Sequence, residues 1–294
     1  MINKKRVVPL LVFAVMLSLV SLAAGQTSKG KKVFVITDLE GVSGIVDSDT
    51  QCSPYQCPRW EESRKLLTGE VNAAVGGLLE GGATEVVVWD AHDGSRTLSV
   101  TDIHPQARLL TGTPVSPTCE LDPGYSAVVF IGQHAMAGAQ NGILSHSYSS
   151  QGIQNIWVNG KPTGEIGARV MLAGYFGVPV IMLSGDTAAC KEIHALVPQA
   201  ECAEVKSGVS RGAGLTLPHS AACALIREKA RRAMERLGEF KPYKITGPAE
   251  VKVEFTPRGT PDFAPREGVE RLNDRTWVFR GKDIVDAWLK YSSF

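Results

Sequence analysis

The feature that most constrains the fold is an alternation of short Val/Ile-rich runs with longer segments of helical periodicity. Five runs are short, apolar and followed by turn-forming residues, as buried strands are: Val33–Thr37, Glu85–Trp89, Ala127–Ile131, Ile153–Val158 and Val178–Leu183. Between them lie the helical patterns Trp60–Glu80, Thr163–Phe176, Ala188–Leu196 and Ser220–Leu237. This alternation predicts an α/β fold, with a mainly parallel sheet covered by helices on both faces.

The C-terminal part of the chain has a different texture. After Lys241, the segment Val251–Phe255 alternates apolar with charged residues and is followed by a Pro/Gly-rich loop. Thr276–Phe279 and a terminal helix from Lys282 complete the pattern. We expect a main α/β domain over residues 32–240 and a smaller α+β region over residues 241–294.

The first residues are typical of an export signal. A cationic start precedes the apolar run Val7–Ala24, and small residues lie at Ala23-Ala24-Gly25. We therefore expect a signal peptide over residues 1–25, a polar linker over 26–31, a periplasmic or extracellular location, and no stable membrane contact after cleavage. A retained membrane anchor is the alternative, because the run is just long enough to span a bilayer.

Charge and composition exclude several classes of protein. The chain has 294 residues, of which 44% are hydrophobic and 21% charged, so it is neither a disordered protein nor a coiled coil. Lys and Arg total 31 against 30 Asp and Glu, and without a basic excess we expect no nucleic-acid partner.

The chain has an even number of cysteines, and after export they would lie in an oxidising compartment, where disulfides can form. Cys52 and Cys57 flank a short turn and could bridge, whereas Cys190 and Cys223 lie in helical apolar patterns and are expected to be buried thiols. None of the six cysteines has the spacing of a metal-ligand pair.

Metal-competent side chains follow the predicted strands at the point where each strand ends. Asp38 and Glu40 follow the first strand, His92 the second and His134 the third, and Glu165 begins a helix after the fourth. The carboxyl ends of parallel strands share one edge of a sheet, so we expect these side chains to converge there.

The types of side chain in this set indicate a divalent metal site. Asp38 and Glu40 leave an extended strand on the same side, where two carboxylates repel one another unless a cation lies between them. Adding His92, His134 and Glu165 gives a mixed oxygen and nitrogen set suited to Zn, with Mn or Co possible, and large enough for two ions that share a carboxylate. Each residue alone has an ordinary structural explanation; the joint pattern favours a site.

These motifs, in this order, resemble those of the DppA-type D-aminopeptidase family of zinc metallopeptidases. The resemblance rests on Asp38-Leu39-Glu40-Gly41, Asp90-Ala91-His92, Gly132-Gln133-His134, Ser145-His146-Ser147 and Gly164-Glu165-Ile166-Gly167. It implies a two-zinc site in which Asp38 bridges both ions, Glu40, His92, His134 and Glu165 complete the ligands, and His146 is the catalytic residue. It also implies short peptide substrates with an N-terminal D-residue, and a homo-oligomer that forms a closed decameric ring.

Two alternatives remain open from the sequence. A two-metal phosphoesterase would use the same ligand types, and a non-catalytic exported metal-binding protein would not need His146. For an aminopeptidase, Asp90, Asp93 and Asp186 are candidates to accept the substrate's ammonium group, although each could equally cap a helix or orient a ligand.

Overall fold

The computed structural model describes residues 30–53, 57–264 and 266–292. The predicted signal peptide, and all of the linker except its last two residues, therefore lie outside the described residues. Within these ranges no helix combines the length and the apolar character that a membrane crossing requires.

The larger sheet has seven strands within the described residues, in the order β3-β2-β1-β4-β7-β8-β9. Its strands are β1 (Lys32–Thr37), β2 (Glu85–Trp89), β3 (Ala107–Leu110), β4 (Ala127–Gln133), β7 (Val180–Asp186), β8 (Glu201–Ser210) and β9 (Ala213–Thr216). All neighbours pair in parallel except β9, which pairs antiparallel with β8. The predicted parallel sheet is confirmed, whereas β3, β8 and β9 were not predicted.

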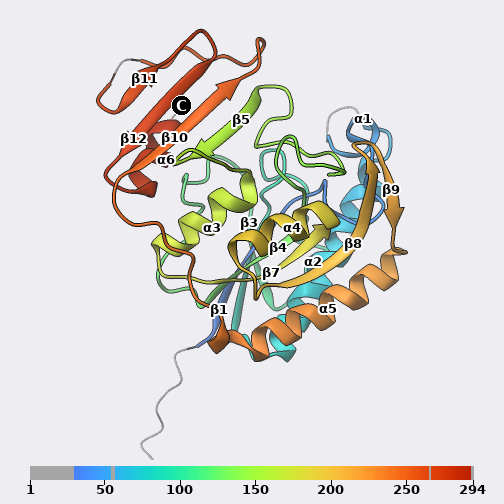
Figure 1. The fold of residues 1–294 in the computed structure, drawn as a ribbon. Helices are drawn as coiled ribbons and strands as arrows, with labels where there is room; N and C mark the ends of the chain where they lie inside the picture. The colour runs from blue at the N-terminus through green and yellow to red at the C-terminus, as the bar shows by residue number, and fades with distance from the viewer. Residues whose placement is uncertain (1–29, 54–56, 265, 293–294) are drawn as a thin grey trace, which may run out of the picture.

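Helices cover both faces of this sheet, as predicted (Figure 1). Val33 and Val35 of β1 pack toward α2 (Trp60–Glu80) and α5 (His219–Glu235). Phe34 and Ile36 belong to the opposite core, with α3 (Glu165–Tyr175) and α4 (Thr187–Leu196). Successive residues of a strand thus pack into opposite cores. Both sets must be apolar, so each strand is a continuous apolar run in the sequence. The short helices α1 (Ser48–Gln51) and η1 (Leu237–Glu239) lie in connections.

A second, antiparallel sheet lies beside the first (Figure 1). Its order is β11 (Val269–Arg271), β12 (Thr276–Gly281), β10 (Ala249–Phe255), β5 (Ile153–Val158) and β6 (Lys161–Pro162). The terminal helix α6 (Ile284–Ser292) packs on it, and so does one side of α3 through Ala168, Met171 and Leu172. Helix α3 is therefore shared between the cores of the two sheets.

The strand predicted at 153–158 forms, but it does not join the parallel sheet. As β5 it pairs antiparallel with β10, so the second sheet combines C-terminal strands with two from the middle of the chain. A parallel return from β4 would need a crossover, usually a helix. The segment 134–152 contains none and instead forms turns around the site described below.

The expectation for Cys190 was wrong. Cys190 of α4 and Cys202 of β8 form a disulfide with a Cα–Cα distance of 5.9 Å, while Cys52 and Cys57 are free thiols. The helical apolar pattern correctly predicted that Cys190 is buried. Strand β8 was not predicted, so Cys202 could not be recognised as the partner of Cys190. Cys223 is a free thiol, as expected, but it is only partly buried.

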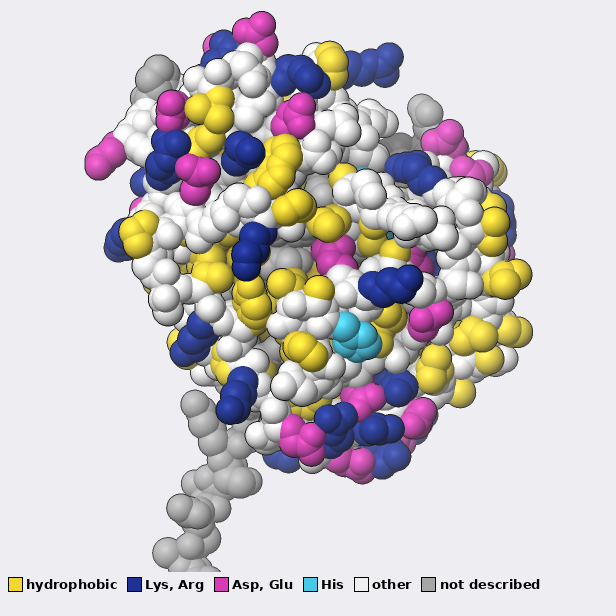
Figure 2. Space-filling view, viewed as in Figure 1, with side chains coloured by type: hydrophobic (Ala, Val, Ile, Leu, Met, Phe, Trp, Pro, Cys, Tyr) yellow, Lys and Arg dark blue, Asp and Glu magenta, His cyan; other side chains and the backbone are white. Residues whose placement is uncertain are grey.

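The surface carries interleaved charges of both signs. Figure 2 shows Lys and Arg mixed with Asp and Glu along the lower edge of the view, where α5 lies. The ion pair between Arg227 and Glu80 joins α5 to α2, and the ion pair between Arg231 and Glu235 links neighbouring turns of α5. Neither positive nor negative charge therefore predominates along this edge.

Candidate metal centre

The site begins where the ends of β1 and β4 meet. The N–H of Asp38 donates to Ile131 O (2.8 Å), and the N–H of Gly41 donates to Gly132 O (2.7 Å). A Cβ at Gly41 would lie 2.1 Å from Gln133 O, and Gly132 has a φ of +74°. Both positions thus require glycine. This close approach places Asp38 beside Gln133 and His134.

All the residues predicted to bind metal lie together at this edge. Together with His146, the side chains of Asp38, Glu40, His92 and Glu165 line a cavity of about 670 Å³, and His134 is buried beside them. His134 Nε2 lies 3.3 Å from both Asp38 Oδ2 and Glu165 Oε1. His92 Nε2 lies 3.4 Å from Glu40 Oε1. The predicted convergence on one edge is present, although Glu165 arrives from the β5–β6 hairpin of the second sheet.

Each of the three imidazole rings has a hydrogen-bond partner at Nδ1. Nδ1 of His134 lies 2.9 Å from Ala135 O, and Nδ1 of His146 lies 2.8 Å from Leu144 O. Because carbonyl oxygens only accept, each Nδ1 must carry a proton, and in the neutral form of the ring the lone pair is then on Nε2. Nδ1 of His92 is paired with Thr97 Oγ1 at 3.1 Å. Holding Nδ1 and directing Nε2 toward carboxylates is the usual arrangement of a metal-binding histidine.

The ligand atoms form two groups. Asp38, Glu40 and His92 make the first, and His134, His146 and Glu165 the second; within each group the candidate atoms lie within 4.8 Å of one another. Asp38 joins the groups through its contact with His134. Each group has the ligand types and the spacing that could hold a cation. By distance alone, His146 could also be a ligand in the second group.

The electrostatics of the site fit a divalent cation. Burial, followed by the charge of Glu40, raises the pKa of Asp38 well above its usual value. Glu40 Oε2 and His134 Nε2 are buried and lack a hydrogen-bond partner in the part of the chain that the structure describes. Unsatisfied buried polar atoms are rare in native proteins, and a bound cation would satisfy both atoms and relieve the carboxylate repulsion. The donor set of carboxylate oxygens and imidazole nitrogens suits zinc.

Comparison with known proteins places the chain in a family. A family model described as D-aminopeptidase matches residues 31–291. This chain belongs to the D-aminopeptidase family. The D-aminopeptidase of Bacillus subtilis (strain 168) is 33% identical over 261 residues, which covers 87% of this chain and 94% of that protein. A solved structure, described as the Zn-dependent D-aminopeptidase DppA from Bacillus subtilis, a self-compartmentalizing protease, matches with a TM-score of 0.82 at 31% identity, covering 88% of this chain and 95% of that chain.

In this D-aminopeptidase family member, three residues for which the sequence predicted no role hold the segments of the site in place. Gln133 Nε2 donates to Asp38 Oδ2 (2.8 Å), and buried Lys206 donates to the carbonyls of Glu40 and Ile45. Glu70 accepts from the N–H of Ser43 (2.9 Å). Gln133 adjoins His134 in sequence and could have been suspected. Lys206 and Glu70 reach the loop from distant elements, and no local pattern marks them.

The three aspartates considered for substrate binding have different environments. Asp90 Oδ2 accepts from the N–H groups of Thr97 and Leu98, which orders the loop that carries His92. Asp186 caps α4 and accepts from the N–H of Ile143. Only Asp93 of the three is exposed, and it lines the cavity.

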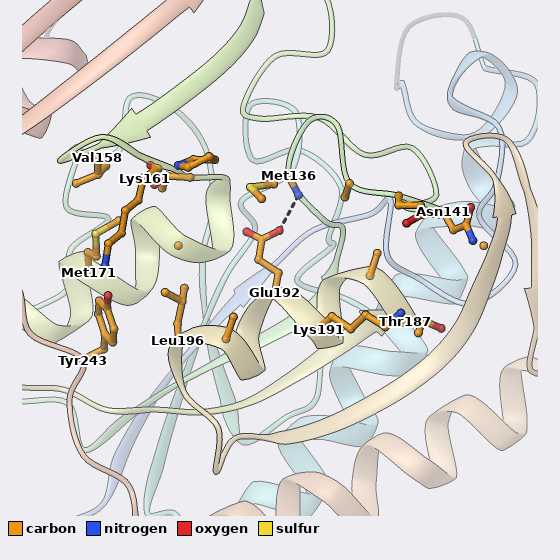
Figure 3. A pocket seen from close by; sticks show the side chains of 18 of the residues that line it. Met136, Asn141, Val158, Lys161, Met171, Thr187, Lys191, Glu192, Leu196 and Tyr243 are labelled. Atoms are coloured by element: carbon orange, nitrogen blue, oxygen red, sulfur yellow. Dashed lines mark hydrogen bonds between the residues drawn. The ribbon is translucent and has the colours of Figure 1, made fainter.

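A second cavity, of about 780 Å³, lies between α3, α4 and the β5–β6 hairpin (Figure 3). Glu192 extends into it from α4 and accepts a hydrogen bond from the N–H of Met136 (2.8 Å). Met136 lies two residues after His134, so this bond fixes the segment that carries His134. Glu192 therefore supports the candidate metal centre from the second cavity.

Glu70 gives a testable pH dependence. Burial raises its pKa to about 7 from an ordinary value of 4.5. Between these values the folded chain holds a proton that the unfolded chain has lost, so wild-type stability falls as the pH rises from 4.5 to 7. Glu70→Gln keeps an acceptor for Ser43 and removes the titration. We expect the variant to gain about 3 kcal/mol relative to wild type across this range.

The measurement is urea unfolding at pH 4.5, 6, 7 and 8 with chelator present throughout. Glu62→Gln is the matched control on the same helix. The hydrogen bond from Arg59 lowers the pKa of Glu62, so its contribution changes only below pH 4.5. A Glu70→Gln difference that stays constant from pH 4.5 to 8 would contradict the prediction.

Proposed function

We propose that this chain is a zinc-dependent aminopeptidase that removes N-terminal residues, D-residues preferentially, from short peptides. One observation carries the proposal: three imidazole Nε2 atoms and three carboxylates converge at one cavity in a member of the D-aminopeptidase family. The Bacillus subtilis relative is described as a Zn-dependent D-aminopeptidase. Family membership favours peptidase chemistry over the phosphoesterase and the non-catalytic metal-binding protein.

We assign two zinc ions to each subunit. Asp38 would lie between them, Glu40 and His92 would hold one, and His134 and Glu165 the other; Mn or Co would suit the same donors. Bound zinc supplies a water with a pKa lowered from 15.7 to about 7 and polarises the scissile carbonyl. Gln133 fixes the carboxylate of Asp38, and Thr97 fixes the ring of His92, so the donors are ordered before the metal binds.

His146 is the proposed catalytic residue. Its ring stacks on that of His134, with centroids 3.9 Å apart, and its Nε2 lies 3.9 Å from Glu165 Oε1. With the proton on Nδ1, Nε2 can take a proton from the attacking water and pass it to the departing amine. Burial, followed by the neighbouring His134, lowers the pKa of His146, which favours this neutral form.

Metal content and turnover separate the proposed roles. We expect Asp38→Ala to reduce zinc from two ions to one or none per subunit, because it removes the shared carboxylate. We expect His146→Ala to keep both ions and lose about 100-fold or more in kcat, as removal of a general base does. Metal is measured by mass spectrometry on the dialysed protein. His194→Ala, exposed and outside the cavity, is the control. Loss of an ion in His146→Ala would make His146 a ligand instead.

Substrate preference tests the function itself. We expect the purified chain with added zinc to hydrolyse D-Ala amides and D-Ala dipeptides at least 10-fold faster than the L-Ala compounds, measured as released amino acid. Equal or reversed preference would remove the D-specific part of the proposal. Hydrolysis of a phosphoester but of no peptide would favour the phosphoesterase, and no turnover of either would favour the metal-binding protein.

We further propose that the chain is exported and assembles into a ring. The N-terminal sequence and the Cys190–Cys202 disulfide support export, because disulfides persist in oxidising compartments. The description of the Bacillus subtilis structure as self-compartmentalizing supports a homo-oligomer, for which we propose a decamer. N-terminal sequencing of the protein from its native compartment should begin at Gln26, and light scattering should give about ten times the subunit mass. An unprocessed N-terminus or a monomer would contradict the respective proposal.

A further inference from the structure

The cavity of the metal centre contains a cation as well as metal-competent groups. Arg169 is the one Lys or Arg among the described residues that line it. It lies on α3 four residues after Glu165, and residues at this spacing share one face of a helix about one turn apart. The helix that would deliver a ligand to the metal thus also delivers a guanidinium to the same cavity.

The guanidinium of Arg169 is held in place by neutral groups. Nη1 donates to Pro117 O (3.2 Å) and lies 2.6 Å from Cys119 Sγ. The guanidinium carbon lies 5.0 Å from the ring centroid of Trp89 and 5.5 Å from that of Tyr148. Contacts with two aromatic rings and two acceptors fix the side chain, so its remaining donors are ordered before any ligand arrives.

No carboxylate in the described part of the chain forms an ion pair with the guanidinium of Arg169. Within those residues, no carboxylate lies within 4.0 Å of Arg169, and Nε and Nη2 make no hydrogen bond. Burial raises the pKa of Cys119 to about 11, so its thiol is neutral at pH 7. Arg169 is half-buried, and charges removed from water are normally paired. The free donors Nε and Nη2 are therefore available to an anion that comes from outside the chain.

Two neighbouring donors point to the same conclusion. The Tyr148 hydroxyl and Trp89 Nε1 are buried and have no hydrogen-bond partner among the described residues, and both side chains line the cavity. The indole can only donate, and the hydroxyl can donate. Arg169 thus lies among unsatisfied donors, an environment that suits a ligand rich in acceptors.

We propose that Arg169 binds the C-terminal carboxylate of the peptide substrate and makes this chain selective for di- and tripeptides with a free C-terminus. The inference rests on the proposed function. A planar carboxylate matches the two free donors of the guanidinium. One helical turn, about 5.4 Å, separates Arg169 from Glu165, and consecutive Cα atoms are about 3.8 Å apart. The carboxylate would therefore lie one or two residues beyond the scissile bond.

The test compares two substrates that differ only at the C-terminus, D-Ala-D-Ala and D-Ala-D-alaninamide. For the zinc-loaded wild type we expect kcat/KM to be about 10- to 100-fold higher for the free acid, as loss of one charged hydrogen-bonded contact predicts. Arg169→Met should remove this preference and change kcat/KM for the amide less than threefold. Arg169→Lys, which keeps the charge but not the paired donors, should retain part of the preference.

Lys161→Met is the matched control, because Lys161 is an exposed cation that lines the second cavity. It should leave the ratio unchanged. Circular dichroism and zinc content show whether each Arg169 variant is folded and loaded, and the wild-type ratio alone tests the inference if neither variant folds.

Equal kcat/KM for the acid and the amide in wild type would overturn the inference and leave the aminopeptidase proposal intact. An equal loss on both substrates in Arg169→Met would also overturn it, since Arg169 would then have a structural role. A wild type that hydrolyses neither peptide would remove the proposed function and this inference with it.

Discussion

The constraint on which the rest of the structure depends is the repulsion between carboxylates that are held close together and partly removed from water. Asp38 and Glu40 follow β1, Glu165 begins α3, and the three carboxylates meet in one partly enclosed cavity, where their charges repel. Three imidazoles compensate in part. The unsatisfied atoms Glu40 Oε2 and His134 Nε2 indicate that the balance is completed by cations. The close approach of β1 and β4 at Gly41 and Gly132 is the backbone feature that brings the first of these groups into place.

Helix α3 connects the two halves of the molecule. Ile166 and Val170 belong to the core under the parallel sheet, whereas Ala168 and Leu172 belong to the core of the antiparallel sheet. A helix packed on two sides has little freedom to move. Its first residue, Glu165, is thereby fixed relative to ligands that arrive from the parallel sheet. The described strands of the antiparallel sheet carry no candidate ligand, but the packing of α3 against that sheet helps to fix the position of Glu165.

Much of this architecture can be predicted from the sequence, because burial on both faces leaves a strong local signal in β1, β2 and β4. The five candidate ligands are predictable for a related reason, since each immediately follows a strand or begins a helix. Other features depend on contacts between distant segments. β8 mixes charged, polar and apolar residues and resembles a surface segment, so neither it nor the bond from Cys202 to Cys190 was expected. The placement of β5 depends on β10, far along the chain, and Lys206 is recognisable only when the loop above it is known.

The position of Arg169 on a helix has a consequence for how substrate length would be measured. Because each helical residue rotates the side chain by about 100°, inserting or deleting a single residue between Glu165 and Arg169 would turn the guanidinium away from the cavity. The distance from the reaction centre to the carboxylate subsite is thus set by the pitch of a rigid element, in contrast to peptidases in which a flexible loop closes over the substrate. A cation placed one full helical turn further along α3 would then favour a longer peptide.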